Sequence, residues 1–216
     1  AIADADALNL DNYEDGETKE TFKTALAAAK AVNTNYEDTL TQENVNNAVT
    51  ELNNAKAALV LKTKAIQIKT QPTKTVYNLG ENVATTDLVV EAVKADDTTE
   101  ELASDAYTVT LDSATTGTKT LTVTLKANTS LTATTDVEVV DGASLDAKVT
   151  EAETKTADKH YTAATKEAFD EKLDAAKAVQ NDIKAVNGGS TVTVSVTAAR
   201  VEEATAALDS AMNDLE

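Results

Sequence analysis

The sequence contains no cysteine and no tryptophan, and aromatic residues make up only 3% of its 216 positions. Without cysteine the chain can form neither a disulfide framework nor a thiolate metal site, and it has no cysteine nucleophile. The few aromatic side chains make it difficult to line a large enzyme cleft. Alanine, valine, leucine and threonine must supply most of the buried surface, which suits slim helical bundles and thin β-sandwiches.

Metal-binding patterns are equally scarce. His160 is the single histidine, and one histidine without a cysteine is a weak basis for a zinc site. The acidic stretch Asp11–Gly16 resembles the start of an EF-hand loop. However, Tyr13 would then occupy the third ligand position and Phe22 the twelfth, where a glutamate is needed. We therefore predict no metal site and no cofactor, and we interpret the acidic stretch as a helix start.

The charge of the chain restricts its partners. It has 37 acidic and 19 basic residues, for a formal net charge of −18. Such a field repels nucleic-acid phosphates and anionic lipids, and no apolar run is long enough to span a bilayer. We predict no nucleic-acid partner and no membrane insertion. No signal peptide begins at Ala1 and no wall-sorting tail ends at Glu216, so we expect any export or anchoring signal to lie outside this segment.

An internal repeat is the most informative feature. Residues 18–32 (TKETFKTALAAAKAV) and 165–179 (TKEAFDEKLDAAKAV) are identical at ten of fifteen positions, at an offset of 147. A second match follows at an offset of 156, and it pairs Val45 and Leu52 with Val201 and Leu208. The change of nine in the offset indicates an insertion in the second copy. Repeats this similar predict two modules with the same fold.

Each copy has helical periodicity. Apolar residues recur at steps of three and four, as in Phe22, Leu26 and Ala29, which places them on one stripe of a helix. Thr41 and Thr162 are expected N-caps. A further helix precedes each pair, over about 145–159 in the second copy. The first copy shows only the second half of this helix. We predict a three-helix bundle in each copy.

Between the copies the period changes to two. Residues 119–126 and 107–111 alternate apolar and polar side chains, as do 137–139 more loosely, and 66–68 and 88–93 add further short apolar runs. Threonine and valine in short alternating runs, separated by turn residues, predict an antiparallel β-sandwich. The expected architecture is therefore multi-domain α and β: a three-helix bundle over 1–62 with its first helix truncated, an Ig-like β-sandwich over 63–141, and a second three-helix bundle over 142–216.

Two features bear on function. No Gly-, Pro- or Ser-rich linker separates the modules, which predicts semi-rigid joints. The insertion in the second helical module, near 186–196, has a Gly-Gly turn before an alternating valine run and suggests a hairpin. Because a loop added to a plain scaffold is where binding is most easily acquired, this insertion is the best candidate for a ligand-binding segment.

The helical copies resemble the FIVAR module of Gram-positive surface proteins and secreted glycoside hydrolases. The residues that carry this resemblance are Tyr13, Phe22, Leu26, Thr41-Gln42-Glu43, Val45, Ala48 and Leu52 in the first copy, and Tyr161-Thr162, Phe169, Leu173, Ala176, Ala178, Val179, Val201, Ala204 and Leu208 in the second. The central segment resembles a bacterial Ig-like domain of group three, through Pro72–Tyr77, Gly80-Glu81, Asp96–Thr98 and Gly117–Lys119. The resemblance implies an extracellular, cell-wall or cell-surface location and no shared catalytic residues.

Catalytic patterns are weak. The carboxylate pairs Asp96-Asp97 and Glu100-Glu101 could in principle serve glycoside hydrolysis, but they fall on a predicted turn. We predict no enzyme, no catalytic, cofactor-binding or metal residue, and assign no residue to ligand binding. Three hypotheses follow: a structural spacer of a bacterial surface protein, an adhesive module that binds a host matrix protein, serum protein or glycan, and an accessory region of a secreted glycoside hydrolase. The expected oligomeric state is a monomer.

Overall fold

The computed structural model describes residues 1–34, 40–155 and 161–215, and it divides into two compact units. The first unit comprises residues 1–65 together with 92–100, and the second comprises 66–91 and 101–216. The division runs through β-strands, because residues 92–100, at the tip of one β-hairpin, belong with the N-terminal helices.

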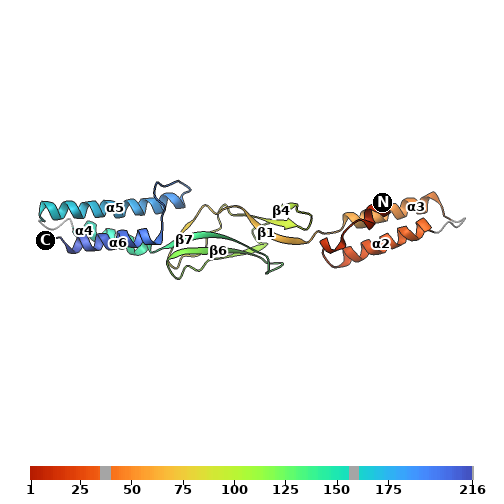
Figure 1. Cartoon of the computed structure of the whole chain (residues 1–216), viewed down its shortest axis with the longest axis horizontal. Coiled ribbons are helices and arrows are strands. Elements are labelled where there is room, and N and C mark those ends of the chain that lie inside the picture. Colours follow the sequence, from red (N-terminus) through yellow and green to blue (C-terminus); the bar gives the residue numbers. More distant parts are fainter. Residues whose placement is uncertain (35–39, 156–160, 216) are drawn as a thin grey trace. The chain divides into compact units, whose positions relative to one another are not determined.

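The first unit begins with helices. These are α1 (Ile2–Asp6), the 3-10 helix η1 (Leu10–Asn12), α2 (Glu17–Thr34) and α3 (Gln42–Ala57). Helices α2 and α3 lie side by side (Figure 1). Phe22 of α2 and Leu52 of α3 share a core with the small residues Ala5, Ala29 and Ala55. Small side chains at these positions allow the helix axes to approach closely.

Threonines begin three of the long helices, as predicted for two of them. Thr41 accepts a hydrogen bond from the backbone N–H of Asn44, whose side chain in turn accepts from the Thr41 backbone N–H, which completes a capping box. Thr162 and Thr197 cap α5 (Ala163–Asn187) and α6 (Ala198–Asn213) through their hydroxyl groups. These caps satisfy N–H groups of the first turn, which have no partner within the helix.

In the part of the chain that the structure describes, seven strands form two sheets. They are β1 (Thr63–Thr70), β2 (Val76–Asn78), β3 (Val89–Lys94), β4 (Thr99–Glu101), β5 (Tyr107–Thr110), β6 (Gly117–Leu125) and β7 (Thr132–Val140). One sheet has the order β1-β3-β4 and the other β2-β7-β6-β5. Strand β7 pairs antiparallel with β6 and parallel with β2. The predicted strands are confirmed, whereas β2 and β4 were not predicted because three residues are too few to show an alternation.

Residues from both sheets form one sandwich core. Leu121, Val123 and Leu125 alternate with polar residues along β6, and all three are buried. They share a core with Ile66, Tyr77, Leu88, Val90, Tyr107, Val137 and Val139. The phenol group of Tyr77 donates to the backbone carbonyl of Ala84 at 3.0 Å, so its polar end is satisfied inside the sandwich.

The second unit ends with α4 (Gly142–Lys155), α5 and α6. All three contact one another, and α6 lies alongside α5 in the opposite direction (Figure 1). Phe169, Leu145, Val201 and Leu208 are fully buried in their shared core. Phe169 and Phe22 are equivalent in the repeat, and each is 0% exposed. The duplicated sequence therefore places the same side chain at the centre of each helical core.

Candidate functional site: the joints of the β-sandwich

The sandwich core and the C-terminal helical core meet at two adjacent strands. On β2, Val76 belongs to the helical core and Tyr77 to the sandwich core. On β7, Val139 faces the sandwich core, whereas Val140 belongs to the helical core. Successive side chains of a strand point to opposite faces, so the first two residues of β2 and the last two of β7 serve both cores at once. All four side chains are at most 4% exposed.

Glu138 of β7 reaches the start of α6. One oxygen of its carboxylate accepts a hydrogen bond from the backbone N–H of Ala198 at 2.6 Å, and the other accepts from the Thr118 hydroxyl at 3.0 Å. Ala198 is the first residue of α6, where the backbone N–H has no helical partner and the helix dipole favours a negative charge. A strand of the sandwich therefore completes the cap of this helix.

Further contacts surround this joint. The Asn187 side chain, at the end of α5, accepts a hydrogen bond from the Val76 backbone N–H at 3.2 Å. The Thr116 hydroxyl donates to the Glu202 carboxylate at 3.0 Å. Where β7 passes into α4, Gly142 lies so close to Asn78 that a Cβ atom would come within 2.3 Å of its Oδ1 atom. Only glycine fits here without a shift of the neighbouring side chain.

The segment near 186–196 does not form the hairpin that its sequence suggests. Helix α5 continues to Asn187, and residues 188–197 contain no strand. Ile183 and Val186 continue the apolar stripe of the helix and pack against its core. The residues that would form the first half of a hairpin are thus taken up by the helix, and the valine run of 192–196 has no partner strand.

This segment is part of the joint. Val196 is buried in the helical core. Arg200 donates to the Val194 carbonyl at 2.9 Å and forms an ion pair with Asp182 at 2.6 Å, which ties the segment to both α5 and α6. The Val194 side chain is the exposed one, with 54% of its surface accessible. The candidate ligand-binding segment is therefore an anchored loop on which Val194 is the exposed valine, beside several exposed polar residues.

The N-terminal helices are tied to the sandwich strands within the first unit. Tyr13 and Leu61 form an antiparallel β-bridge. On either side of it, the Glu14 N–H donates to the Val60 carbonyl and the Lys62 N–H donates to the Asn12 carbonyl, both at 2.8 Å. The Lys62 carbonyl accepts in turn from the Ala95 N–H at 2.9 Å. A short piece of β-structure, without a flexible linker, therefore connects helix to strand.

An ion pair supports this first joint. Lys19 is buried, and its ammonium group lies 2.7 Å from the Asp15 carboxylate, with Lys62 on the other side at 3.7 Å. The hydrogen bond from Lys19, followed by the positive charges of Lys19 and Lys62, holds the pKa of Asp15 below its usual range. Within the acidic stretch that resembles a calcium loop, the Asp15 carboxylate therefore pairs with Lys19 and Lys62.

The carboxylate pairs considered for glycoside hydrolysis have local partners. Asp96 accepts from the N–H and the hydroxyl of Thr98, and these bonds lower its pKa. Lys94 lies 2.8 Å from Glu100 and lowers the pKa of that carboxyl. Asp97 pairs with Lys64. A general acid for glycoside hydrolysis requires a raised pKa, so neither Asp96 nor Glu100 suits that role.

Within 1–34, 40–155 and 161–215, no group of three or more histidine, cysteine, aspartate and glutamate side chains is arranged to hold a metal ion. In the same ranges, no helix combines the length and apolar character needed to cross a bilayer. His160 lies outside the described residues.

The sequence did not reveal Glu138 or Asn187 as joint residues. Each belongs to a regular element, and the partner of each lies 60 or more positions away along the chain. The one available signal was the pair Val139-Val140 at the end of β7, where two adjacent apolar residues break the alternation of a half-exposed strand. Such a break indicates that the outer face is also covered there.

Comparison with known proteins identifies the centre of the chain. Residues 70–139 match the family of bacterial Ig-like domains, group 3. The match lies within the β-sandwich and leaves both sets of helices outside it. A search of curated proteins finds no match to the chain.

Proposed function

We propose that this chain is a non-catalytic spacer segment of an extracellular bacterial surface protein. The bacterial Ig-like match at 70–139 supports this proposal, since domains of this family occur in surface proteins. The finer assignment is that both helical regions are FIVAR-like three-helix bundles and that the protein belongs to the cell wall of a Gram-positive bacterium. It rests on the repeat and on the motif residues quoted above. The spacer is a monomer that binds no nucleic acid and does not enter the membrane.

The observation that carries the proposal is the joint between the sandwich and the C-terminal helices. Val76 and Val140 bury apolar surface on the helices, and Glu138 caps one of them. Domains joined by a flexible linker move independently, whereas here bending would expose buried valines and leave a helical N–H without a partner. A spacer needs this resistance to bending.

Distance measurements within the second unit test the spacer function. Because the chain has no cysteine, Thr129→Cys and Glu171→Cys accept two spin labels at defined positions, in the β6–β7 turn and on α5. Pulsed dipolar spectroscopy should give one narrow distance distribution. Adding Glu138→Ala and Asn187→Ala should broaden it. A broad distribution in the otherwise unaltered chain would contradict the spacer function.

An adhesive module is the alternative, and the exposed Val194 side chain is the observation that favours it. Deletion of the whole insertion would remove the buried Val196 and is therefore a poor test. Val194→Ser changes only the exposed position, and Val60→Ser, at a site 52% exposed in the first unit, is a matched control. Both variants should be compared on immobilised matrix proteins, serum proteins, mucin and glycans. Saturable binding that only Val194→Ser abolishes would favour adhesion. An absence of binding favours the spacer over adhesion and over a carbohydrate-positioning accessory region of a glycoside hydrolase.

A further inference from the structure

Strands β2 and β7 lie beside each other in one sheet of the sandwich and run parallel. Their register pairs Val76 with Glu138, Tyr77 with Val139 and Asn78 with Val140. Backbone hydrogen bonds extend this pairing at both ends. The Glu138 N–H donates to the Thr75 carbonyl, and the Leu79 N–H donates to the Val140 carbonyl, both at 2.9 Å. Because β7 leads directly into α4, the C-terminal part of the chain is attached to the sandwich at this pair.

The parallel direction of the two strands decides how tension along the chain acts on them. Tension pulls β2 toward its N-terminal end, through residues 71–75, and pulls β7 toward its C-terminal end. In parallel strands these two directions are opposite, so the strands can separate only by sliding, which loads all the hydrogen bonds of the ladder at once. In an antiparallel pair the two pulled ends are adjacent, and the bonds open one after another. Tension therefore loads the β2–β7 pair in shear.

The β2–β7 pair is covered on both faces. Tyr77 and Val139 lie in the sandwich core, whereas Val76 and Val140 lie in the core of α4, α5 and α6. All four side chains are at most 4% exposed. A hydrogen bond between strands breaks more easily where water can replace one of its partners. The helices on the outer face therefore shield these bonds from water as long as they stay in place.

We propose that α4, α5 and α6 brace the β2–β7 pair, so that they raise the tension that the sandwich withstands before it unfolds. Two polar contacts add to the buried valines. The Asn187 side chain of α5 accepts from the Val76 N–H at 3.2 Å, and Glu138 of β7 accepts from the first N–H of α6. The proposal rests on the spacer function, because a spacer is a segment that carries tension.

Single-molecule pulling tests the brace, and the absence of cysteine allows the points of attachment to be chosen. In the full chain, Gln71→Cys and Ala143→Cys accept DNA handles at exposed positions, so that α5 and α6 lie outside the loaded segment. Optical tweezers then measure the unfolding rate of the sandwich at constant force. Phe169→Asp places a charge in the helical core and unfolds the helices. The rate should rise about tenfold, because Val76 and Val140 are then already exposed to water.

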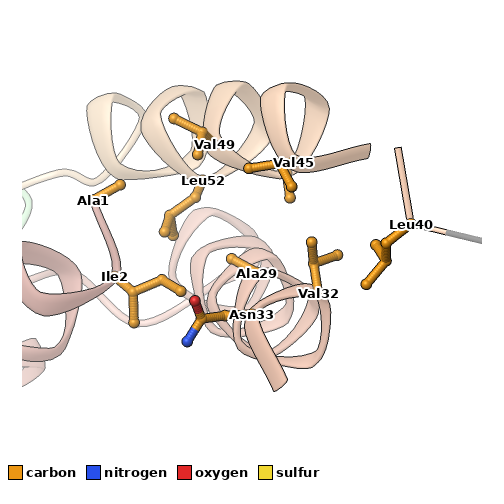
Figure 2. Close-up of a pocket in the computed structure, with 10 residues that line it drawn as sticks. Ala1, Ile2, Ala29, Val32, Asn33, Leu40, Val45, Val49 and Leu52 are labelled. Carbon is orange, nitrogen blue, oxygen red and sulfur yellow. The ribbon is translucent and has the colours of Figure 1, made fainter. Parts of the chain in front are cut away.

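The repeat supplies a matched control, Phe22→Asp. Phe22 is equivalent to Phe169 and equally buried, but it lies in the core of α2 and α3, where Figure 2 shows Leu52 of α3 pointing toward α2. This core contains no residue of β2 or β7, so the substitution should leave the unfolding rate of the sandwich unchanged. An equal rate with and without Phe169→Asp would overturn the proposal.

A milder variant covers the case in which Phe169→Asp also prevents the sandwich from folding. Asn187→Ala removes one hydrogen bond of the brace and leaves the helical core intact. It should raise the unfolding rate about threefold, and an unchanged rate would also overturn the proposal.

A change of pulling direction tests the shear geometry itself. Leu79→Cys, at a position 46% exposed, replaces Gln71→Cys as the first attachment. Tension then acts at adjacent ends of β2 and β7, so their bonds open one after another and the sandwich should unfold at a lower force. Equal forces in the two directions would contradict the proposal. A broad spin-label distance distribution, in contrast, would contradict the spacer function and leave these unfolding rates as they are.

Discussion

The carboxylate of Glu138, on the last strand of the sandwich, accepts a hydrogen bond from the backbone N–H of Ala198 at 2.6 Å. Ala198 is the first residue of α6. A negative charge at this point satisfies an N–H group that the helix cannot pair and interacts favourably with the helix dipole. One side chain thus connects the folding of the sandwich to that of the C-terminal helices.

Removal of this carboxylate should destabilise the second unit. Glu138→Ala leaves the Ala198 N–H without its acceptor in a buried position, and we expect a loss of about 2 kcal/mol in the free energy of unfolding. Glu138→Gln keeps an acceptor without the charge and should cost about half as much. Urea denaturation measures both values. Thr118→Ala is the control, since it removes the other partner of the carboxylate and should cost less. Equal stability of the unaltered chain and Glu138→Ala would refute the role of this bond.

Where β7 passes into α4, Gly142 lies against the side-chain oxygen of Asn78. Gly142→Ala places a methyl group 2.3 Å from the Asn78 side-chain oxygen, and we expect a cost of about 1–2 kcal/mol from the forced displacement. In an Asn78→Ala background the clash is absent, so Gly142→Ala should cost little. Gly188→Ala is a matched control, because its nearest contacts are 3.4 Å away. Thermal denaturation of the unaltered chain, the two single variants and the double variant measures the coupling free energy between positions 78 and 142. Strictly additive losses of stability would show that the close approach of Gly142 to Asn78 is unimportant.

The two helical cores should respond separately to equivalent substitutions. Phe22 and Phe169 occupy the same repeat position and are both fully buried, but they lie in different cores. Phe22→Ala and Phe169→Ala should each lower the free energy of unfolding of the core that contains the residue by about 3–5 kcal/mol. Hydrogen exchange should accelerate in α2 and α3 after Phe22→Ala, and in α4, α5 and α6 after Phe169→Ala. Faster exchange in α5 after Phe22→Ala would contradict this separation.

The ion pair at the first joint predicts a dependence on acidic pH. Lys19 and Lys62 lower the pKa of folded Asp15, whereas an unfolded aspartate titrates at about 3.9. The stabilisation is therefore complete above that pH and is lost as the pH falls through the lower, folded pKa. The stability difference between the unaltered chain and Asp15→Asn should be constant from about pH 5 to 8 and should shrink below about pH 4.

The pH series needs a control for the general effect of acid. Asp105 is exposed, and its carboxylate has no ion pair among those found in the described residues, so Asp105→Asn should show no comparable change. Urea denaturation at each pH gives the difference in free energy of unfolding between the unaltered chain and each variant. A difference between the unaltered chain and Asp15→Asn that grows as the pH falls would mean that the pKa of Asp15 is raised instead.

The periodicity of the sequence predicted the helices and strands but did not predict the contacts between residues far apart in the chain. The steps of three and four around Phe22 and Phe169, and the alternation of 119–126, predicted helices and strands that the structure confirms. The hairpin predicted from the valine run of 192–196 was wrong, because an alternating segment forms a strand only where a partner strand is available. Helix α5 takes up the residues on one side of the Gly-Gly turn, so none is available.

The sequence by itself determined the duplication, the change of period between the copies, the caps at Thr41 and Thr162, and the absence of cysteine chemistry, because each of these depends on residues that are close together in the chain or on composition alone. Only the tertiary structure decided that Val76 and Val140 serve a second core and that Glu138 caps α6. Such contacts join residues many positions apart, and they depend on where whole elements pack, which the burial of apolar surface determines over the entire chain.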